Sequence, residues 1–337
     1  MDHKMPAFET GGTITINETE TLDDVIAKMQ ETLHPLHMKS LRRAMEIERS
    51  AHKLHPGSYN FMPTHTASYV ARAITRGWQT PVTLTISGRI LNKETLAGKI
   101  AQQMMIDSVS VLNALNDSLL LANYDTKPST VFEIILPDTY ELYWDWPMDK
   151  ILNRLKKEYD LYWNKERVAL ANAQGLTPKE VSVLASIVSE ETNKADEFPK
   201  VACVYINRLK KGMKLQACPT VCYIYDYSIR RVLYRHLENP SPYNTYKYAG
   251  LPPGPIALPG KEHIEAVLHP DKHNYMYFCA DSNLSGYNKY SETYAQHLVY
   301  AREYQAMMDR RAAEKAAAAE AEAMQVVLVD PALAPKE

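Results

Sequence analysis

The stretch Thr177-Pro-Lys-Glu-Val-Ser-Val-Leu-Ala-Ser-Ile-Val-Ser-Glu-Glu-Thr192 decides how the second half of this 337-residue chain folds. Its opening places Thr at the N-cap, Pro at the first helical position and Glu three residues after the cap, which is a capping box. Leu184, Ile187 and Val188 then recur at the spacing of one helix face. Glu191 extends that face by one more turn. The stretch predicts a helix whose apolar stripe ends in a carboxylic acid.

The position of Glu191 makes it a candidate general acid. A carboxyl group set against apolar surface loses hydration of its charged form, and its pKa rises toward the range that acid catalysis near neutral pH requires. Glu190 points off the stripe and is expected to be solvated. The alternative, that Glu191 merely ends the helix at the surface, is favoured by periodicity alone, because exposed glutamates are common at helix ends.

A Pro/Gly-rich loop follows, with the segments Ser241-Pro-Tyr-Asn-Thr-Tyr246 and Gly250-Leu-Pro-Pro-Gly-Pro-Ile256. The repeated Pro and Gly fix an unusual backbone path. Two of its side chains are tyrosines that can stack on sugar faces, and two carry amide or hydroxyl groups that can bond sugar hydroxyl or acetamido groups. These four residues are Tyr243, Tyr246, Asn244 and Thr245. A rigid connector without a binding role is the alternative, although long irregular segments in compact domains are more often functional.

An extended glycan has apolar faces and polar edges, so stacked aromatic rings flanked by amide and hydroxyl groups hold it well. We expect the loop to line a groove with Glu191 near its centre.

The first half contains a weak internal repeat. Thr13-Ile-Thr-Ile16 and Val82-Thr-Leu-Thr-Ile86 alternate as strands do, and each precedes the start of a helix, at Thr21 and Lys93. Strand and helix repeated at similar spacing predict two related small α/β units. The predicted fold class is therefore α+β.

The rest of the chain supplies connecting and terminal elements. A charged helix from Asp149 to Ala173 is expected to bridge to the second half, where a further helix from Val201 to Lys211 stops at Gly212. The Ala/Glu-rich tail from about Arg310 is expected to be a solvated helix that frays, and Val326 to Glu337 to lack fixed structure.

Composition excludes several classes of protein. The formal net charge is −2, which gives no electrostatic case for nucleic acid. The cysteines form neither a C-x-x-C pair nor a zinc-like cluster, and they are expected to be small buried hydrophobes, with disulfides as the alternative outside the cytoplasm. They are Cys203, Cys218, Cys222 and Cys279. No apolar run approaches the ~20 residues that a membrane span needs, and the first ten residues have no signal-peptide core.

Several ordered motifs resemble those of the endolytic murein transglycosylase (MltG, or YceG-like) family. Leu184 to Thr192 is similar to the family's A-S-I-V-x-x-E-T signature. Further matches lie in the same order and cover roughly residues 10 to 305. They are Pro56–Tyr59, Pro137–Tyr140, Val204–Leu209, Gly212–Gln216, Pro219–Val221, Tyr243–Tyr246, Gly250–Ile256 and Met276–Phe278.

The resemblance implies LysM-like α/β units followed by a lysozyme-related catalytic domain. It divides the chain into an α/β unit at 1–80, a LysM-like unit and connector at 81–148, a catalytic domain at 149–305 and a tail at 306–337. Glu191 falls on the family's catalytic Glu, and polar contacts to the glycan are expected from Asn207, Gln216 and Thr220 on the neighbouring helix and turn. A cut inside a strand requires a groove that is open at both ends. The implied reaction is non-hydrolytic cleavage of peptidoglycan between N-acetylmuramic acid and N-acetylglucosamine, leaving a 1,6-anhydro end, with no cofactor and no metal.

The resemblance also implies a setting for this reaction. Its substrate is the peptidoglycan glycan strand, nascent strands are the ones to be terminated or trimmed, and peptidoglycan synthases are candidate partners. The family is anchored in the inner membrane by a single N-terminal span with its catalytic domain in the periplasm. No stretch of this sequence has the length and apolar character of such a span.

Three positions depart from the family pattern. Cys218 stands where the family has Asp, Tyr287-Asn288 stands where Gly-His is usual, and Ser87-Gly88 stands where Glu-Gly is usual. The first two put some binding contacts in doubt. Two other functions therefore stay open: a glycoside hydrolase that uses a second carboxylate such as Asp196 or Glu197, and a cell-wall protein that binds glycan without cutting it.

Overall fold

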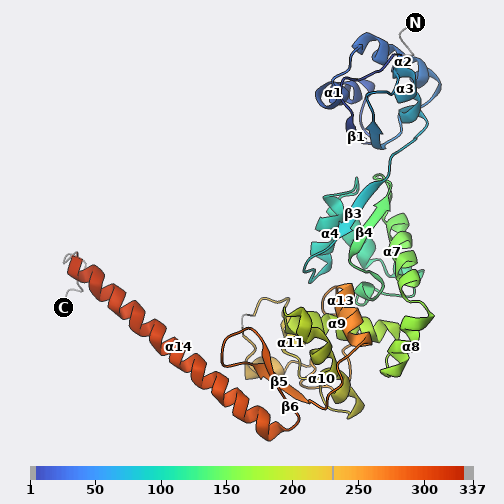
Figure 1. Cartoon of the computed structure of the whole chain (residues 1–337). Coiled ribbons are helices and arrows are strands. Elements are labelled where there is room, and N and C mark those ends of the chain that lie inside the picture. Colours follow the sequence, from blue (N-terminus) through green and yellow to red (C-terminus); the bar gives the residue numbers. More distant parts are fainter. Residues whose placement is uncertain (1–4, 230, 330–337) are drawn as a thin grey trace. The chain divides into compact units, whose positions relative to one another are not determined.

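The computed structural model describes residues 5–229 and 231–329, which form two compact units (Figure 1). Of the described residues, the first unit contains 5–166 and 257–261, and the second contains 167–229, 231–256 and 262–329. Helices and small two-stranded antiparallel sheets make up both units, so the expected mixed α and β class is confirmed. The four-part division predicted from the sequence is finer than these two units and stays a prediction.

The first unit repeats one arrangement, in which two antiparallel strands enclose a group of helices. β1 pairs with β2 from Gly12↔Phe61 to Ile16↔Gly57, and β3 pairs with β4 from Val82↔Leu142 to Ile86↔Asp138. The predicted internal repeat is therefore confirmed. Its elements are β1 (Gly12–Ile16), α1 (Leu22–Leu33), α2 (Met38–Ala51), β2 (Gly57–Phe61) and, after α3 (Ala67–Thr75), β3 (Val82–Ile86), α4 (Lys93–Ala101), α5 (Ser108–Asn116), α6 (Ser118–Ala122), η2 (Val131–Ile134) and β4 (Asp138–Leu142).

Alternation along the paired strands explains why each repeat folds. In β1 and in β3 the third and fifth residues are buried, and they are Ile14, Ile16, Leu84 and Ile86. Because side chains alternate across a strand, these residues face the helices while the threonines between them stay partly or fully exposed. Helix α1 begins at a capping box in which Thr21 accepts a hydrogen bond from the backbone N–H of Asp24.

The predicted charged helix from Asp149 to Ala173 is wrong as a single element. It is two helices, α7 (Met148–Tyr162) and α8 (Lys165–Ala173), separated at Trp163 and Asn164. The Trp163 side chain is buried beside the rings of Tyr159 and Tyr162, at centroid distances of 6.2 and 5.8 Å. This packing ends α7. The sequence around Trp163 contains no helix-breaking residue that would predict the end of the helix.

The second unit is built around α9 (Pro178–Glu191), which contacts α10 (Phe198–Lys210) and α11 (Cys218–Ile224) (Figure 1). Every residue of α9 from Val181 to Val188 is buried, so the helix is enclosed on all sides and not only along one stripe. Ser186 makes this possible on the polar side, because its hydroxyl accepts a hydrogen bond from the backbone N–H of Ile256 at 3.0 Å. The Pro/Gly-rich loop is thereby attached to the middle of α9.

The remaining elements complete the second unit. They are η3 (Ala195–Glu197), α12 (Tyr234–Leu237), α13 (Lys261–Leu268), the hairpin of β5 (Tyr277–Ala280) and β6 (Asn288–Ser291), and α14 (Tyr294–Val329). The hairpin pairs from Tyr277↔Ser291 to Ala280↔Asn288, and α14 contacts both of its strands. Among the described residues, no helix combines the length and the apolar character needed to cross a membrane.

Two expectations about the ends of elements and the cysteines are corrected. The tail helix includes Val326 to Val329, which were expected to lack fixed structure, while the other residues of that expected segment lie outside the described residues. None of the four cysteines forms a disulfide, and only Cys203 is buried, so the expectation of four buried hydrophobes is wrong for Cys218, Cys222 and Cys279.

The capping box of α9 yields a stability prediction. The Thr177 side chain accepts from the Glu180 N–H at 3.3 Å, and the Glu180 carboxylate accepts from the Thr177 N–H at 2.8 Å. Replacing Thr177 with Ala should lower the free energy of unfolding by about 1 kcal/mol, because one N-terminal N–H of the helix loses its acceptor. Urea unfolding followed by circular dichroism measures the change. Thr177→Ser keeps the oxygen and should lose much less; equal losses in both variants would contradict the capping role.

Candidate active site

Glu191 is the last residue of α9 and opens onto a cavity of about 430 Å³ within the second unit. The cavity is lined from several directions: by α9, by α10, by the turn before α11, by the Pro/Gly-rich loop, by the β5–β6 hairpin and by the start of α14. The residue itself is partly accessible, as a group that faces a cavity must be. Its carboxyl group is nevertheless surrounded by protein atoms.

Burial raises the pKa of the Glu191 carboxyl group from its ordinary value of 4.5 to about 7. Two neighbours oppose this rise. The Tyr205 hydroxyl donates a hydrogen bond to Glu191 Oε1 at 2.6 Å, and the positive charge of Arg208 acts from the same helix as Tyr205. Both favour the charged carboxylate, so the acid titrates near neutral pH and can both give and take a proton there. The raised pKa that the sequence predicted for Glu191 is consistent with this geometry.

Arg208 is held away from a direct ion pair with the acid. Its Nε donates to the carbonyl oxygen of Met276 and its Nη1 to that of Leu215, and its guanidinium group lies over the Tyr277 ring at 5.3 Å from the centroid. These bonds use two of the five N–H donors and fix the position of the guanidinium group. No hydrogen bond joins the described side chains of Arg208 and Glu191, so Arg208 influences the pKa of Glu191 through its charge.

Three residues singled out by the sequence meet Glu191 at the cavity. Gln216, Tyr246 and Cys218 all line it. The Cys218 sulfur and the Tyr246 hydroxyl are hydrogen bonded at 3.0 Å. Gln216 has a left-handed backbone with φ 50°, and its N–H donates to the carbonyl oxygen of Thr245 at 3.1 Å, which ties the turn to the loop. Cys218, at the position of the family's Asp, therefore faces the cavity.

Three other predicted contacts lie inside the protein beneath the cavity wall. The Thr220 and Thr245 hydroxyls are buried and hydrogen bonded to each other at 2.9 Å. Thr245 also accepts from the Ala217 N–H at 3.0 Å. Asn244 is fully buried and donates to the carbonyl oxygens of Leu237 and Asn239, both at 2.8 Å. These side chains bond backbone groups of the segments beside the loop, and they do not line the cavity.

Asn207 and Tyr243 are placed elsewhere. The Asn207 amide donates to the carbonyl oxygens of His273 and Tyr275, at 2.9 and 3.2 Å, and the residue lines a separate cavity with the segment before β5. The Tyr243 ring lies against the Tyr223 ring, at a centroid distance of 4.7 Å. Neither residue lines the cavity with Glu191.

The structure adds residues that the sequence reasoning did not place in the site. Tyr205 and Arg208 come from α10, and Phe278 and Asn288 come from the hairpin. Tyr205 and Arg208 stand one helical turn apart within a helix that the sequence did predict. The sequence feature that could have identified Tyr205 and Arg208 is a polar group on a largely buried helix, because buried polar side chains require partners.

Neither proposed second carboxylate lines the cavity. Asp196 is exposed, whereas Glu197 is buried and accepts four hydrogen bonds from protein groups. Among the described residues that line the cavity, Glu191 is the only one with a carboxyl group. Within the described part of the chain, His, Cys, Asp and Glu side chains also form no group of three or more that could hold a metal ion.

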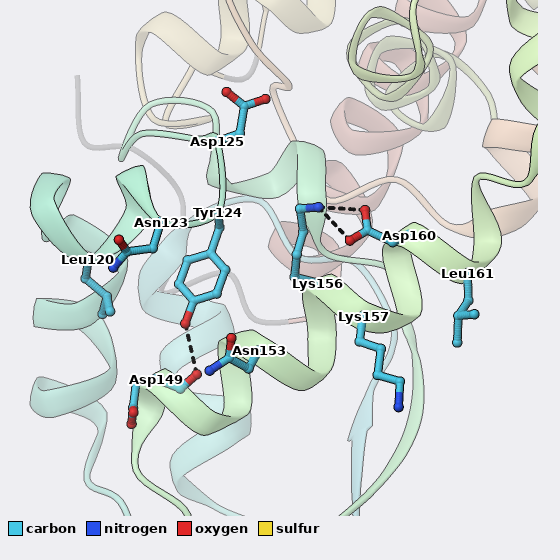
Figure 2. A pocket seen from close by; sticks show the side chains of 10 residues that line it. All are labelled: Leu120, Asn123, Tyr124, Asp125, Asp149, Asn153, Lys156, Lys157, Asp160 and Leu161. Atoms are coloured by element: carbon cyan, nitrogen blue, oxygen red, sulfur yellow. Dashed lines mark hydrogen bonds and ion pairs between the residues drawn. The ribbon is translucent and has the colours of Figure 1, made fainter.

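A larger cavity, of about 820 Å³, lies in the first unit beside α6 and α7 (Figure 2). Two of its charged side chains contact each other: Lys156 bonds both carboxylate oxygens of Asp160, at 2.6 and 2.8 Å. The Tyr124 hydroxyl donates to the backbone carbonyl of Asp149 at 3.0 Å. None of the residues predicted for the site lies there, so the smaller cavity, which holds an acid with a raised pKa, is the better candidate.

Comparison with known proteins agrees with this site. The chain matches the YceG-like family over residues 14–303. It belongs to that family. A match to the endolytic murein transglycosylase of Bacillus subtilis has 34% identity over 241 residues and covers 65% of this chain and 66% of that protein. A match to the endolytic murein transglycosylase of Streptococcus pneumoniae R6 has 29% identity over 172 residues and covers 50% of this chain.

The chain covers just under two thirds of the length of the Bacillus protein and 28% of the pneumococcal one. Among solved structures, the 2.6 Å crystal structure of a YceG-like protein from Listeria monocytogenes aligns with a TM-score of 0.55 and 25% identity. That alignment covers 85% of this chain and 98% of the Listeria chain. The mixed α and β fold described above is thus the fold of a YceG-like protein.

The raised pKa of Glu191 predicts a pH dependence of stability. Between the unfolded value of 4.5 and the folded value of about 7, the folded protein keeps a proton that the unfolded chain has lost, so stability falls as pH rises through this window and is flat above it. Glu191→Gln should therefore gain stability relative to the wild type between pH 5 and pH 8, by on the order of 1–3 kcal/mol, reduced by the partial exposure of the residue. Urea unfolding at both pH values measures it.

Glu190→Gln is the matched control for this measurement, because Glu190 neighbours the acid without lining the cavity. It should show no such gain across the same pH range. A Glu191→Gln variant whose stability tracks that of the wild type at both pH values would show that the carboxyl group is well hydrated in the folded protein.

Proposed function

We propose that this protein is an endolytic murein transglycosylase that cleaves the bond between N-acetylmuramic acid and N-acetylglucosamine in peptidoglycan and leaves a 1,6-anhydro end. The observation that carries the proposal is a single cavity-lining carboxyl group whose pKa lies at about 7. The matches to endolytic murein transglycosylases over half or more of the chain support the same activity.

The first chemical step needs a proton on Glu191. With Oε1 accepting from Tyr205, the proton of the neutral acid sits on Oε2. Oε2 donates this proton to the oxygen of the glycosidic bond, the bond between that oxygen and the anomeric carbon breaks, and the sugar passes through an oxocarbenium-like state. The resulting carboxylate keeps its bond from Tyr205 and the field of Arg208, which stabilise its negative charge.

The second step returns the enzyme to its starting state. The 6-hydroxyl oxygen of the same muramic residue attacks the anomeric carbon, and its proton passes to Glu191. No water enters the balance. Attack within one molecule has a large effective concentration over attack by water, which lets one acid serve both steps.

The two alternative functions make different demands on the site. A glycoside hydrolase needs a second carboxylate at a set distance from the first to activate water or to attack the sugar, and Glu197 is engaged by four protein donors instead. A protein that only binds glycan has no need of a buried acid, which costs stability at neutral pH. Both considerations favour the transglycosylase.

The setting of the reaction is part of the proposal. The strand–helix–strand repeats of the first unit are proposed to be LysM-like, and the second unit to act on glycan strands outside the cytoplasm, tethered to the inner membrane by an N-terminal span. The catalytic region is proposed to lie within residues 149–305, preceded by units at 1–80 and 81–148 and followed by the tail at 306–337. Peptidoglycan synthases, whose nascent strands it would terminate or trim, are the proposed partners.

Mass spectrometry of muropeptides after incubation with purified peptidoglycan tests the proposed reaction. Internal fragments that end in 1,6-anhydro-N-acetylmuramic acid are the expected product. Fragments with reducing ends would identify a hydrolase, and binding to peptidoglycan without any fragments would identify a glycan-binding protein.

The role of Glu191 can be tested against its neighbour. Glu191→Gln should reduce turnover by at least about 1,000-fold, because the near-isosteric amide cannot transfer the proton, while glycan binding and the fold are retained. Glu190→Gln should keep turnover within a few-fold of wild type. Release of anhydro-muropeptides over time measures both variants, and a loss in Glu190→Gln as deep as that in Glu191→Gln would assign the acid to the wrong residue.

The hydrogen bond from Tyr205 should set the upper pH limit of the reaction. In Tyr205→Phe the carboxylate loses a donor that lowers the pKa of Glu191, so that pKa should rise by about one unit. Since the first step needs the protonated acid, the basic limb of the pH–rate profile should move to higher pH. Tyr59→Phe removes another buried hydroxyl, one that donates to a backbone carbonyl, and should leave the profile in place. A basic limb that moves downward in Tyr205→Phe would refute the assigned role.

A further inference from the structure

Glu197 is a buried carboxylate whose acceptor sites are filled by protein donors. Oε1 accepts from the backbone N–H of Asn288 at 2.9 Å and from the Tyr290 hydroxyl at 2.8 Å. Oε2 accepts from the side-chain Nδ2 of Asn288 at 3.1 Å and from the Thr192 hydroxyl at 3.0 Å. An ionised carboxylate offers about four lone-pair sites and no proton, so this set uses its full capacity.

The two bonds to Asn288 determine how that side chain points. Because Glu197 only accepts, the group that faces it must be the amide NH₂, and the carbonyl oxygen Oδ1 must face the other way. The backbone N–H of the same residue is fixed by the other oxygen of the same carboxylate. Asn288 is thus held at two points, and rotation of its amide would bring two acceptors together.

Asn288 is the first residue of β6 and stands opposite Ala280 of β5. Asn288 and Ala280 line the cavity together with Glu191. Among the residues that the structure describes, none donates a hydrogen bond to Asn288 Oδ1. The oxygen is therefore available to a ligand in the cavity.

Several polar groups on this cavity wall are already engaged or can only donate. The Tyr205 hydroxyl is used by Glu191, the Tyr246 hydroxyl is shared with Cys218, and Arg208 can only donate. A glycan strand, by contrast, presents hydroxyl and acetamido N–H donors along its edges. Unmatched donors of a bound sugar would lose their bonds to water, so an oriented acceptor beside the acid adds directly to binding.

We propose that Asn288 is a substrate-binding residue of this site, that its Oδ1 accepts a hydrogen bond from a hydroxyl or acetamido N–H of the bound sugar, and that Glu197 is the positioning residue that aims it. The inference rests on the proposed function, because the donor is assigned to a glycan. Glu197 also contacts the residue that follows the catalytic acid in the chain. The hydroxyl that it holds belongs to Thr192, the C-cap of α9 and the residue next to Glu191.

Binding measured without turnover separates this role from catalysis. In the full chain carrying Glu191→Gln, titration with a chito-oligosaccharide, an oligomer of N-acetylglucosamine, by isothermal calorimetry gives the affinity directly. Adding Asn288→Ala should weaken binding about 3- to 10-fold, the loss expected for one neutral hydrogen bond. In the otherwise wild-type enzyme the same change should raise KM for peptidoglycan more than it lowers kcat.

The positioning role of Glu197 is tested by a double-mutant cycle. Glu197→Gln should weaken oligosaccharide binding, and Asn288→Ala should add little to it, because the acceptor is already misaimed. Two variants serve as matched controls. Asp196→Asn changes an exposed acid beside Glu197, and Asn283→Ala changes an exposed amide in the turn of the same hairpin. Both should bind the oligosaccharide as tightly as the Glu191→Gln parent does. Circular dichroism of each variant checks that the fold is intact.

The outcomes separate this inference from the proposed function. If the wild type releases anhydro-muropeptides but Asn288→Ala binds the oligosaccharide with unchanged affinity, the binding role of Asn288 is wrong and the transglycosylase stands. If the losses from Glu197→Gln and Asn288→Ala simply add, Asn288 binds sugar without being aimed by Glu197. If the wild type neither cleaves peptidoglycan nor binds the oligosaccharide, the proposed function fails and this inference fails with it.

Discussion

The second unit depends on one constraint at Glu191. Its carboxyl group lies where a negative charge is poorly hydrated, and it must still be able to ionise. Burial alone would push its pKa further upward; the donor on Tyr205 and the charge of Arg208 hold it at about 7. Arg208 does so without forming an ion pair, because its bonds to the backbone carbonyls of Leu215 and Met276 hold the guanidinium group in place. A direct pair would favour the carboxylate strongly and remove the acid.

The parts of the fold that sequence could predict are those that local contacts decide. The capping box at Thr177 and the alternation at 82–86 depend on residues a few positions apart, and the structure has a helix and a strand at those places. The break between α7 and α8 could not be predicted in this way, because it comes from burial of Trp163 against Tyr159 and Tyr162 and the sequence around it remains typical of a charged helix. Tertiary packing there overrides local propensity.

The candidate site also contains residues that the sequence could predict and residues that it could not. Helical spacing puts Glu191 on the apolar face of its helix, but spacing alone favours an exposed helix end, and the family motif was needed to single Glu191 out. Gln216 and Tyr246 were placed by their motifs. Asn244, Thr220 and Thr245 were expected at the glycan because they are polar. Their side chains instead bond one another or backbone groups of Ala217, Leu237 and Asn239, since buried N–H and C=O groups require partners. The contact between Glu197 and Asn288 joins residues 91 positions apart through the packing of a helix against a hairpin, so no spacing rule reveals it.

Cys218 leaves Glu191 as the one carboxylic acid among the described residues that line the cavity. The family motif has Asp at this position, and a second carboxylate beside Glu191 would either raise the pKa of Glu191 by repulsion or share its proton. The thiol avoids this, because loss of hydration raises its own pKa, with the charge of Glu191 acting in the same direction, and it stays neutral in its hydrogen bond with Tyr246. Proton transfer in the cavity therefore has no second carboxylate to draw on among the described residues that line it. In the proposed reaction Glu191 both gives the proton and recovers it, as an intramolecular ring closure requires and a hydrolysis shared between two carboxylates does not.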